Sequence, residues 1–497
     1  MIRPAELYER LGFPIKRRGC DPIAIAHRGA SAYALENTEA AFRKAAALGA
    51  DMWEIDVQLS ADGVPVISHD DDLGAMAGKA VKISKTAWND LQAITLGNGE
   101  RLLSLDHAID LALELDAGLY VEIKADGAGA KTWKQLEARR FERAVIGSFQ
   151  HHAIEELRKA GCSYPLSILV PVGTDPILAA ERTGADVIHP CWLDARADPQ
   201  MLLTEALLQE AESRGLSIVT WHEERRSVLD VLERLPIFGI CSNRPETIKP
   251  YRRDSAHPIR LVCHRGANHV APENTEAAAR ICFDQRFDFV EVDVRTSSDG
   301  ALVVIHDDTV DRTTSGTGYV ADMNLSKMRA LDAGSWFEPH FSTETIPTLG
   351  EMLTLARAYG RGLYIEPKAA DPAAVLHEVR AQQMLKRCFF GSVMPDIMRE
   401  FRRLAPDAIL MARRCDFTSL EETITDTNAQ IIEFDVTSDD LGEVTRCRDL
   451  GVASMIFSTT TDRSELKRLH DLKPDYLNLD RPDLAKRCLP SRMGRVR

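Results

Sequence analysis

Short apolar runs alternate along the chain with longer stretches in which apolar residues recur with helical spacing. The first apolar runs, "PIAIA" and "DMWEIDV" at residues 22–26 and 51–57, have the length and composition of buried strands. Between them, residues 42–49 place small or apolar residues at i, i+3, i+4 and i+7, behind Asn37 and Thr38 as candidate helix caps. Strands that alternate with helices in this way predict βαβ units and a parallel sheet.

The first half of the chain contains nine candidate strands. After the two named above they are "VPVISH", "LYVEIK", "AVIGSF", "LSILV", "DVIHP", "LSIVTW" and "IFGICS". A unit of about 240 residues with roughly eight strand–helix pairs fits a closed (β/α)8 barrel, whose usual length is about 250 residues. One of the nine runs is then not a barrel strand. A doubly wound open sheet is the alternative architecture.

The same polar residues appear twice at a constant distance. One offset of 237 positions relates six pairs: His27 and His264, Glu36 and Glu273, Glu54 and Glu291, Asp56 and Asp293, Asp62 and Asp299, and His69 and His306. Glu122 and Glu366 differ by 244, so the second copy carries seven extra residues before this point. The predicted fold class is therefore α/β, with two tandem (β/α)8 TIM barrels over residues 1–250 and 257–497. The charged, Pro-containing stretch 244–260 marks the linker.

Composition limits the classes of function that such a chain can have. The 497 residues are 44% apolar and 27% charged, which is typical of a globular protein, and no apolar run approaches the roughly 20 residues of a membrane span. The formal charge of −14 argues against nucleic-acid binding. The N-terminus lacks the apolar segment of a signal peptide, and the ten cysteines form no C-x-x-C pair, so we expect reduced thiols and a cytoplasmic location.

Polar residues stand at the ends of the predicted strands in the first unit. In order along the chain they are His27, Glu54 and Asp56, His69, and Glu122 with Lys124. Because the carboxyl ends of parallel barrel strands lie on one rim, we expect these residues to converge. Three carboxylates in a small volume repel one another unless a cation neutralises them, and oxygen ligands favour Mg²⁺ or Ca²⁺.

Imidazole and basic groups accompany the predicted carboxylate cluster. His27 and His69 suit acid–base catalysis near neutral pH, and Arg28 and Lys124 can hold phosphate oxygens. A divalent ion, two histidines and two cations together predict hydrolysis of a phosphate ester. Taken singly each signal is weak, since a Glu-x-Asp pair is usually a solvated strand face and Asp62-Gly63 is most simply a turn. Their appearance twice, in one order, favours an active site in each unit.

In this order the motifs resemble those of the glycerophosphodiester phosphodiesterase family. The family pattern is His-Arg-Gly, Pro-Glu-Asn-Thr, Glu-x-Asp, Asp-Gly, His-Asp and Glu-x-Lys. The first copy reads His27-Arg28-Gly29, Glu36-Asn37-Thr38, Glu54-Ile55-Asp56, Asp62-Gly63, His69-Asp70 and Glu122-Ile123-Lys124. The second reads His264-Arg265-Gly266, Pro272-Glu273-Asn274-Thr275, Glu291-Val292-Asp293, Asp299-Gly300, His306-Asp307 and Glu366-Pro367-Lys368. The resemblance covers nearly the whole chain, once per unit.

The resemblance implies a TIM-barrel enzyme that hydrolyses small-molecule glycerophosphodiesters to sn-glycerol 3-phosphate and an alcohol, with one divalent cation, Mg²⁺ or Ca²⁺, in each barrel. The implied metal ligands are Glu54, Asp56 and Glu122 in the first copy and Glu291, Asp293 and Glu366 in the second. The implied catalytic pairs are His27 with His69 and His264 with His306. The implied phosphate-binding residues are Arg28, Lys124, Arg265 and Lys368. Glu36 and Glu273 would help to order the two sites.

The two copies depart from the family pattern at different places. The second keeps "HDDTVDRTTSGTG" at residues 306–318, whereas the first lacks the Asp-Arg-Thr-Thr run and has Leu35 in place of the proline. The first ends a late strand in Trp221, whereas the second has "MIFSTTTD" without tryptophan. The family's late Thr-Asp-x-Pro is replaced by Ser242-Asn243-Arg244-Pro245 and Leu479-Asp480-Arg481-Pro482. We therefore expect two active sites with different substrate pockets.

Three other interpretations stay open on sequence alone. One barrel can be a non-catalytic binding or dimer-like partner of the other. The activity can be of the lysophospholipase D type, although no obvious membrane-facing segment stands out. A sugar-binding barrel is also conceivable, but it leaves the clustered carboxylates and histidines unexplained. The leaving alcohol, the choice between Mg²⁺ and Ca²⁺, the group that first attacks phosphorus and the oligomeric state are not specified by the sequence.

Overall fold

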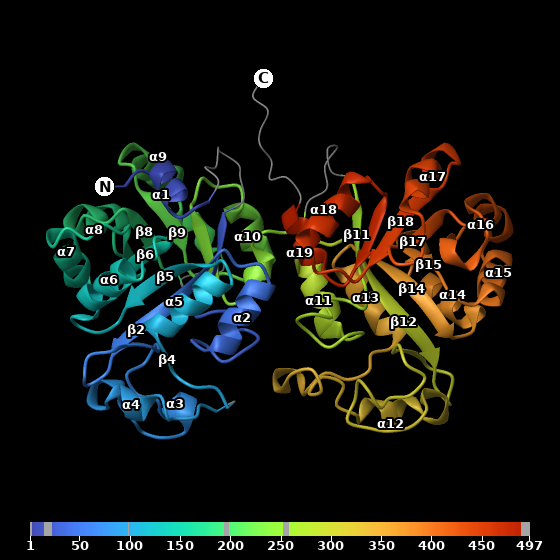
Figure 1. Cartoon of the computed structure of the whole chain (residues 1–497), viewed down its shortest axis with the longest axis horizontal. Helices are drawn as coiled ribbons and strands as arrows, with labels where there is room; N and C mark the ends of the chain where they lie inside the picture. Colours follow the sequence, from blue (N-terminus) through green and yellow to red (C-terminus); the bar gives the residue numbers. More distant parts are fainter. Residues whose placement is uncertain (1, 14–21, 98, 193–197, 252–257, 489–497) are drawn as a thin grey trace. The chain divides into compact units, whose positions relative to one another are not determined.

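A computed structural model describes residues 2–13, 22–97, 99–192, 198–251 and 258–488 of the protein. The chain forms two compact units that divide between Lys249 and Pro250, called barrel 1 and barrel 2 below. In each unit the strands form a central sheet and helices surround it (Figure 1). Among the described residues, no helix is long and apolar enough to cross a membrane.

Barrel 1 is a closed ring of eight parallel strands. Strand β1 pairs with both β10 and β2, which closes the sheet. The strands are β1 (Ile23–Ala26), β2 (Met52–Leu59), β5 (Gly118–Ile123), β6 (Ala144–Ser148), β7 (Leu166–Val170), β8 (Val187–Pro190), β9 (Ser217–Thr220) and β10 (Gly239–Ser242). The outer helices are α2 (Glu39–Ala47), α5 (Leu105–Glu114), α6 (Ala128–Ala138), α7 (His151–Lys159), α8 (Pro176–Thr183), α9 (Glu205–Ser213) and α10 (Arg226–Leu232), with short η2 (Pro199–Leu202) and η3 (Pro245–Thr247). The predicted (β/α)8 barrel is confirmed, and the open sheet is excluded.

The third of the nine apolar runs of the first unit, which contains β3 (Pro65–Ile67), is not a barrel strand. It pairs antiparallel with β2 and with the short strand β4 (Leu103–Ser104). The expectation that one of the nine runs lies outside the barrel is thus met by β3, whereas the expectation that His69 ends a parallel strand is wrong. His69 reaches the rim by another route, because the antiparallel pairing returns the chain along β2, where Ser68 N–H donates to the carbonyl of Asp56 at 3.0 Å.

Between β3 and β4 the chain leaves the ring and forms a small layer of its own. This segment contains α3 (Gly74–Ala77), η1 (Ile83–Lys85) and α4 (Trp88–Leu91). It encloses a separate apolar cluster of Val66, Leu73, Ile83, Leu91, Leu96 and Leu102. The first copy thus keeps an excursion at this point of the chain, although it lacks the Asp-Arg-Thr-Thr run.

Barrel 2 repeats the closed ring with eight parallel strands, and β11 pairs with both β19 and β12. The strands are β11 (Arg260–Cys263), β12 (Phe289–Thr296), β14 (Gly362–Ala369), β15 (Cys388–Phe390), β16 (Ile409–Arg413), β17 (Ile431–Asp435), β18 (Ala453–Ser458) and β19 (Tyr476–Leu479), with β13 (Leu302–Val304) antiparallel to β12. The helices are α11 (Glu276–Asp284), α13 (Leu349–Ala358), α14 (Pro372–Ala381), α15 (Pro395–Leu404), α16 (Leu420–Thr427), α17 (Arg446–Asp449), α18 (Arg463–Asp471) and α19 (Pro482–Cys488), with short η6 (Leu385–Arg387), η7 (Arg414–Asp416) and η8 (Leu441–Thr445). The excursion after β13 holds η4 (Val320–Asp322), α12 (Leu325–Arg329) and η5 (Pro339–Phe341).

The helix that follows the first strand begins in the same way in both barrels. In barrel 1 the hydroxyl oxygen of Thr38 accepts a hydrogen bond from the Ala41 N–H, and in barrel 2 Thr275 accepts one from Ala278. Each threonine therefore satisfies one of the N–H groups that the first helical turn leaves unpaired. The cap predicted at Thr38 is confirmed.

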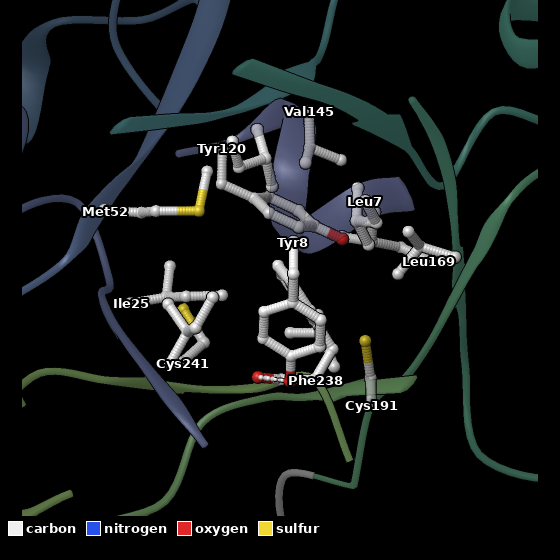
Figure 2. Close-up of a cluster of buried hydrophobic side chains, with 14 residues drawn as sticks. Leu7, Tyr8, Ile25, Met52, Tyr120, Val145, Leu169, Cys191, Phe238 and Cys241 are labelled. Carbon is white, nitrogen blue, oxygen red and sulfur yellow. Dashed lines mark hydrogen bonds between the residues drawn. The ribbon is translucent and has the colours of Figure 1, made fainter. Parts of the chain in front are cut away.

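The N-terminal helix α1 (Pro4–Arg10) closes the floor of barrel 1, at the amino ends of the strands. Leu7 and Tyr8 pack into the cluster of inward-facing strand residues that includes Met52, Tyr120 and Phe238 (Figure 2). Apolar burial of this kind stabilises a fold by roughly 25 cal/mol per Å² of surface removed from water. The helix thus fills the wide end of the ring and leaves the opposite rim for chemistry.

Barrel 2 fills the corresponding space with larger strand side chains. The registers make Phe289, Phe389 and Tyr476 of barrel 2 equivalent to Met52, Val145 and Gly239 of barrel 1. These three aromatic rings contact one another, with centroids 5.2 to 6.0 Å apart. The two barrels therefore share a backbone plan but not the packing of their interiors.

Candidate metal and catalytic centres

Three carboxylates from two neighbouring strands meet at the rim of barrel 1. Glu54 and Asp56 leave the same face of β2, and the register pairs Asp56 with Glu122 of β5. All three side chains are buried, and each offers an oxygen within 4.8 Å of the others. The convergence expected from the strand ends is therefore present.

The His-Arg-Gly turn after β1 aims a backbone donor at this cluster. Arg28 has a left-handed backbone with φ of 54°, and its N–H donates to Oε2 of Glu54 at 2.9 Å. Such a φ is costly for a residue other than glycine and persists only where the surroundings hold it. At Gly29, with φ of 83°, a Cβ atom would lie 2.7 Å from Cβ of Ala41. The short motif is thus a tight turn whose geometry admits no side chain at its third position.

Two cations lie against the carboxylates of barrel 1. Nε of Arg28 lies 3.3 Å from Oδ2 of Asp56, and its Nη1 lies 2.9 Å from Oε1 of Glu36. Nζ of Lys124 lies 3.2 Å from Oδ1 of Asp56 and 2.6 Å from Oε1 of Glu122. Asn37 completes the shell, because its side-chain amide donates to Oδ2 of Asp56 at 2.9 Å.

Burial and mutual repulsion shift the proton affinities of the carboxylates in opposite directions. Burial, with Asp56 and Glu122 nearby, raises the pKa of Glu54 well above its usual value. Burial and the charge of Asp56 also raise the pKa of Glu122, to about 7. Burial acts in the same sense on Asp56, but Lys124 and Arg28 outweigh it and lower the pKa of that carboxyl.

Each carboxylate cluster has an oxygen that the protein leaves unsatisfied. Oε1 of Glu54 and Oε1 of Glu291 are buried and accept no hydrogen bond from the part of the chain that the structure describes. A buried acceptor without a partner costs about 1–3 kcal/mol, and a bound cation would remove that cost. Each cluster offers oxygens from three carboxylates within 4.8 Å of one another, and such an oxygen set fits a hard divalent cation.

Two histidines flank the cluster in barrel 1. Nδ1 of His27 lies 2.7 Å from Oδ1 of Asn243, which also accepts a hydrogen bond from the Ser31 hydroxyl. Because an amide oxygen only accepts, His27 carries its proton on Nδ1 and has a free lone pair on Nε2. Burial and the charge of Arg28 lower the pKa of His27 to about 3. Nδ1 of His69 lies 2.8 Å from Oδ1 of Asp70.

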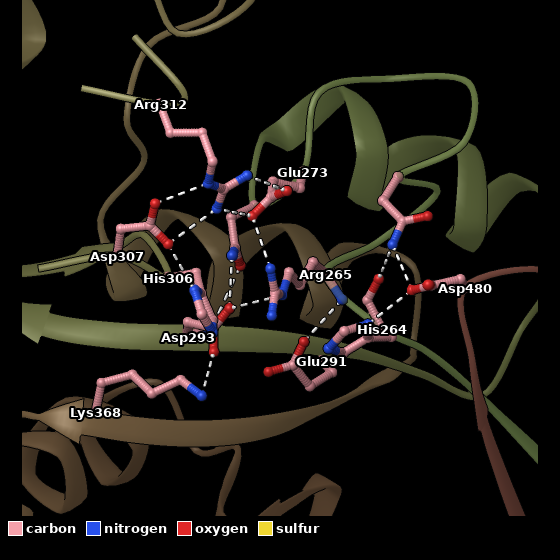
Figure 3. Close-up of polar contacts among 12 residues, drawn as sticks. His264, Arg265, Glu273, Glu291, Asp293, His306, Asp307, Arg312, Lys368 and Asp480 are labelled. Atoms are coloured by element: carbon pink, nitrogen blue, oxygen red, sulfur yellow. Dashed lines mark hydrogen bonds and ion pairs between the residues drawn. The ribbon is translucent and has the colours of Figure 1, made fainter. Parts of the chain in front are cut away.

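Barrel 2 repeats this arrangement (Figure 3). Glu291, Asp293 and Glu366 form the second carboxylate cluster. The N–H of Arg265 donates to Glu291 at 2.7 Å, the amide of Asn274 donates to Asp293 at 2.8 Å, and Nζ of Lys368 lies 3.2 Å from Oδ1 of Asp293. Burial, with Asp293 and Glu366 nearby, raises the pKa of Glu291 well above its usual value.

The histidine partners differ between the barrels. Nδ1 of His264 lies 2.7 Å from the carboxylate of Asp480, at the position that Asn243 holds in barrel 1. The second histidine has the same type of partner in both barrels: Nδ1 of His306 lies 2.7 Å from Oδ1 of Asp307, and Nδ1 of His69 lies 2.8 Å from Oδ1 of Asp70. Sequence comparison marks Asn243 and Asp480 only as departures from a motif, and their contact with the histidines follows from the closure of each ring.

Barrel 2 also has a guanidinium that the sequence reasoning missed. Nε of Arg312, in the excursion after β13, lies 2.7 Å from Oδ2 of Asp307, and its Nη1 lies 2.9 Å from Oε2 of Glu273. The retained Asp-Arg-Thr-Thr run was a signal for this contact, because Arg312 is its second residue. Asn37 and Asn274 were likewise read as part of a helix start rather than as donors to the carboxylates.

The structure brings together every predicted site residue within its own barrel. The carboxylates, the first histidine and the two cations come from parallel strand ends, and the second histidine comes from the antiparallel return after β3 or β13. Glu36 and Glu273 contact Arg28 and Arg265 and are not members of the carboxylate clusters.

A model of the Glycerophosphoryl diester phosphodiesterase family matches the chain twice, over residues 27–247 and 264–484. The double match confirms the resemblance and the tandem duplication predicted from the sequence. The chain is similar to the glycerophosphodiester phosphodiesterase of Caldanaerobacter subterraneus subsp. tengcongensis, with 47% identity over 95 residues that span 19% of this chain and 39% of that protein. It is also similar to the glycerophosphodiester phosphodiesterase of Bacillus subtilis, with 35% identity over 141 residues that span 27% of this chain and 48% of that protein. The chain thus spans less than half the length of these two relatives.

Solved structures of single units are also similar to this chain. A glycerophosphodiester phosphodiesterase from Agrobacterium tumefaciens is 38% identical and covers 46% of this chain and 99% of its own, with a TM-score of 0.44. A phosphodiesterase from Oleispira antarctica in complex with the product sn-glycerol-3-phosphate is 27% identical and covers 47% of this chain and 97% of its own, with a TM-score of 0.45.

Proposed function

The chain belongs to the glycerophosphoryl diester phosphodiesterase family, and we propose that each of its barrels hydrolyses glycerophosphodiesters to sn-glycerol 3-phosphate and an alcohol. The observation that carries the proposal is the pair of buried three-carboxylate clusters, each beside two histidines and two cations. A duplication that served only the fold would not require three buried carboxylates in each copy, because each anion removed from water opposes folding.

Each cluster would hold one divalent cation through Glu54, Asp56 and Glu122, or through Glu291, Asp293 and Glu366. Mg²⁺ and Ca²⁺ both accept such oxygen ligands. The bound ion would supply electrophilic polarisation of the phosphoryl oxygens. In barrel 1 the guanidinium of Arg28 and the ammonium of Lys124 lie beside the cluster, where they can bind the remaining anionic oxygens of the diester.

The two histidines divide the proton transfers. Attack on phosphorus, either by water or by the neighbouring glycerol hydroxyl with water opening the cyclic ester afterwards, forms one P–O bond and breaks the P–O bond to the alcohol. One proton must leave the attacking oxygen, and one must reach the departing alkoxide oxygen. In barrel 1, Nε2 of His27 and Nε2 of His69 are the ring atoms left for these transfers, because Nδ1 of each ring is held by Asn243 or Asp70.

A second candidate is that only one barrel is catalytic. The observation behind this candidate is the partner of the first histidine, which is Asn243 in barrel 1 and Asp480 in barrel 2. A carboxylate stabilises a protonated histidine more than an amide does, so the two histidines differ in how readily they hold a proton. The other barrel would then be a binding partner that retains the fold and the carboxylates.

Release of sn-glycerol 3-phosphate from glycerophosphocholine, glycerophosphoethanolamine and glycerophosphoglycerol tests both candidates. We expect release by the wild type to stop in EDTA and to return with Mg²⁺ or Ca²⁺. Glu54→Ala/Asp56→Ala and Glu291→Ala/Asp293→Ala should each remove part of the activity, and the combined variant should remove all of it. Loss of all activity in only one double variant would make the other barrel a partner, and no release with any metal would refute the substrate assignment.

His69→Ala and His306→Ala test the proton-transfer assignment separately from metal binding. Each should lower kcat of its own barrel by about 100-fold or more, which is the usual contribution of a positioned general acid or base. The single variants are best measured in chains whose other barrel is silenced by its double carboxylate substitution. Unchanged kcat in either background would remove that histidine from the catalytic pair.

A further inference from the structure

A chemical difference between the barrels lies on strands β7–β8 of barrel 1 and the equivalent strands β16–β17 of barrel 2. Strand register places Leu169 beside His189 in barrel 1 and Arg413 beside Glu433 in barrel 2, at equivalent positions of β7–β8 and β16–β17. These side chains face inward, because the residues two positions earlier on β7 and β16 line the barrel interior. The pair of Leu169 and His189 in barrel 1 thus corresponds to the pair of Arg413 and Glu433, two ionisable side chains, in barrel 2.

In barrel 1 this side of the rim is an aromatic wall. The ring of Trp221 lies 5.8 Å from Phe149 and 6.4 Å from His189, between centroids. Trp221 also contacts the proposed catalytic His27, at 5.5 Å. Leu169 is buried and belongs to the apolar cluster against which Phe149 and Trp221 pack. The wall therefore extends to one of the two histidines proposed for the proton transfers.

Among the residues that the structure describes, the three rings of the wall, Trp221, Phe149 and His189, carry no positive charge. Burial lowers the pKa of His189 to about 3, so its ring is neutral at physiological pH. Behind the wall, the carboxylate of Glu224 lies 3.1 Å from Nδ1 of His222, whose ring contacts Trp221 at 6.0 Å. Neutral aromatic faces with a carboxylate behind them form an environment that attracts an organic cation.

In barrel 2 the corresponding wall consists of hydrogen-bonding groups. The Asn478 amide donates to Oε1 of Glu433 at 3.2 Å, and Nη2 of Arg413 lies 3.2 Å from Sγ of Cys415. Val393 replaces Phe149 and is 46% exposed. Phe457, 5.0 Å from His264, is the aromatic ring that remains at the position of Trp221. This wall presents a guanidinium and a carboxyl group where barrel 1 presents rings.

We propose that the two barrels select different leaving alcohols: barrel 1 takes a quaternary ammonium alcohol, as in glycerophosphocholine, and barrel 2 takes a polyol, as in glycerophosphoglycerol. A trimethylammonium group needs no hydrogen-bond acceptor and binds the faces of aromatic rings, whereas Arg413 repels it. A polyol needs donors and acceptors when it leaves water, and Arg413 and Glu433 supply them. The inference rests on the proposed hydrolytic function and extends it to the alcohol.

Comparison of two substrates in chains with one silenced barrel tests this selection. Barrel 1 is measured in Glu291→Ala/Asp293→Ala and barrel 2 in Glu54→Ala/Asp56→Ala, with kcat/KM determined for glycerophosphocholine and glycerophosphoglycerol. We expect about a tenfold preference for glycerophosphocholine in barrel 1 and about a tenfold opposite preference in barrel 2. Equal preferences would overturn the inference and leave the proposed hydrolysis intact, whereas no release of glycerol 3-phosphate from either substrate would overturn both.

Single substitutions then assign the selection to named residues. In the barrel 1 background, Trp221→Leu should lower kcat/KM for glycerophosphocholine about tenfold and change that for glycerophosphoglycerol less than twofold. Trp133→Leu, on the outer helix α6, is the matched control and should change neither. In the barrel 2 background, Arg413→Leu introduces the barrel 1 residue and should lower kcat/KM for glycerophosphoglycerol about tenfold. Equal losses on both substrates in either variant would indicate a packing role and overturn the assignment.

Discussion

The ammonium nitrogen of Lys124 lies 3.2 Å from Oδ1 of Asp56, and Lys368 stands at the same distance from Asp293. In each barrel a lysine therefore lies among the carboxylates that we propose as metal ligands. Three buried anions cannot all be charged without compensation, and the lysine supplies part of it. The same side chain is also the predicted phosphate ligand, so the lysine is positioned to contact both the carboxylates and a phosphate oxygen beside them.

Lys124→Met should destabilise barrel 1 most strongly when no divalent ion is present. Removal of one partner of a buried ion pair leaves uncompensated carboxylates, and the free energy of unfolding in EDTA should fall by about 3 kcal/mol. Urea unfolding followed by tryptophan fluorescence measures this, because five of the six tryptophans lie before residue 250. Lys159→Met, at a lysine whose side chain is 77% exposed, is the control. Equal losses in the two variants, or no recovery of stability with Mg²⁺, would contradict compensation by Lys124.

Binding of a divalent ion to barrel 1 should tighten as pH rises from 6 to 8. Burial and neighbouring carboxylates raise the pKa of Glu54, and they raise that of Glu122 to about 7, so the cluster holds protons at pH 6 that an ion must displace. Each displaced proton contributes about a tenfold increase in affinity per pH unit below its pKa. Calorimetry of Glu291→Ala/Asp293→Ala in buffers of different ionisation enthalpy counts the protons. An affinity that is flat over this range would refute the prediction.

The stability of barrel 1 should fall between pH 6.5 and pH 3 because His189 stays neutral in the fold. Its pKa is lowered from 6.5 to about 3 by burial, so in this window the unfolded chain binds a proton that the native chain does not. The free energy of unfolding therefore falls as pH falls, by about 1.4 kcal/mol per pH unit for this group. His189→Gln should remove that part of the slope in urea unfolding by tryptophan fluorescence. His152→Gln, at a side chain that is 59% exposed, should keep the wild-type slope, and an identical slope in both variants would exclude His189 as its source.

Hydrophobic periodicity and the repeat offset predicted two α/β units with parallel strands and favoured a closed barrel, while an open sheet stayed possible until the pairing of β1 with β10 and β2 was known. A helix between two strands makes the strands parallel, so their carboxyl ends lie on the same rim. This brings Glu54, Asp56 and Glu122 together. The same reasoning failed for β3 (Pro65–Ile67), because an apolar run of this length reads alike in a parallel and an antiparallel strand. Only pairing with β2 decides its direction.

Contacts that depend on ring closure could not be predicted from the chain. Asn243 lies 216 positions from His27, and nothing in either local sequence indicates that the last barrel strand delivers the partner of the first histidine. The chain alone likewise does not show which positions of β7–β8 and β16–β17 face the barrel interior, because their buried side chains do not alternate regularly between polar and apolar. For that reason, only the strand register shows that Leu169 of barrel 1 and Arg413 of barrel 2 occupy equivalent positions.

Arg312 connects the second histidine of barrel 2 to the first arginine through two carboxylates. Its guanidinium binds Asp307, which holds Nδ1 of His306, and Glu273, which holds Arg265. The Asp307 side chain is 28% exposed, whereas its barrel 1 equivalent Asp70 is 68% exposed. Hydrogen bonding by Arg312 lowers the pKa of Asp307, which keeps the partner of His306 ionised. In barrel 2 the aspartate partner of His306 is therefore held by Arg312, whereas the barrel 1 equivalent Asp70 is more exposed to solvent.

Arg312→Ala in the Glu54→Ala/Asp56→Ala background should lower kcat of barrel 2 by about 30-fold, because a small misplacement of a reacting group has a cost of this order. Arg312→Lys should restore only part of the rate, since an ammonium cannot bind two carboxylates with the planar geometry of a guanidinium. Arg280→Ala, which removes an exposed pair with Glu276 on α11, controls for the loss of one surface charge. If Arg312→Ala and Arg280→Ala have the same kcat and KM, the connection through Arg312 does not position His306.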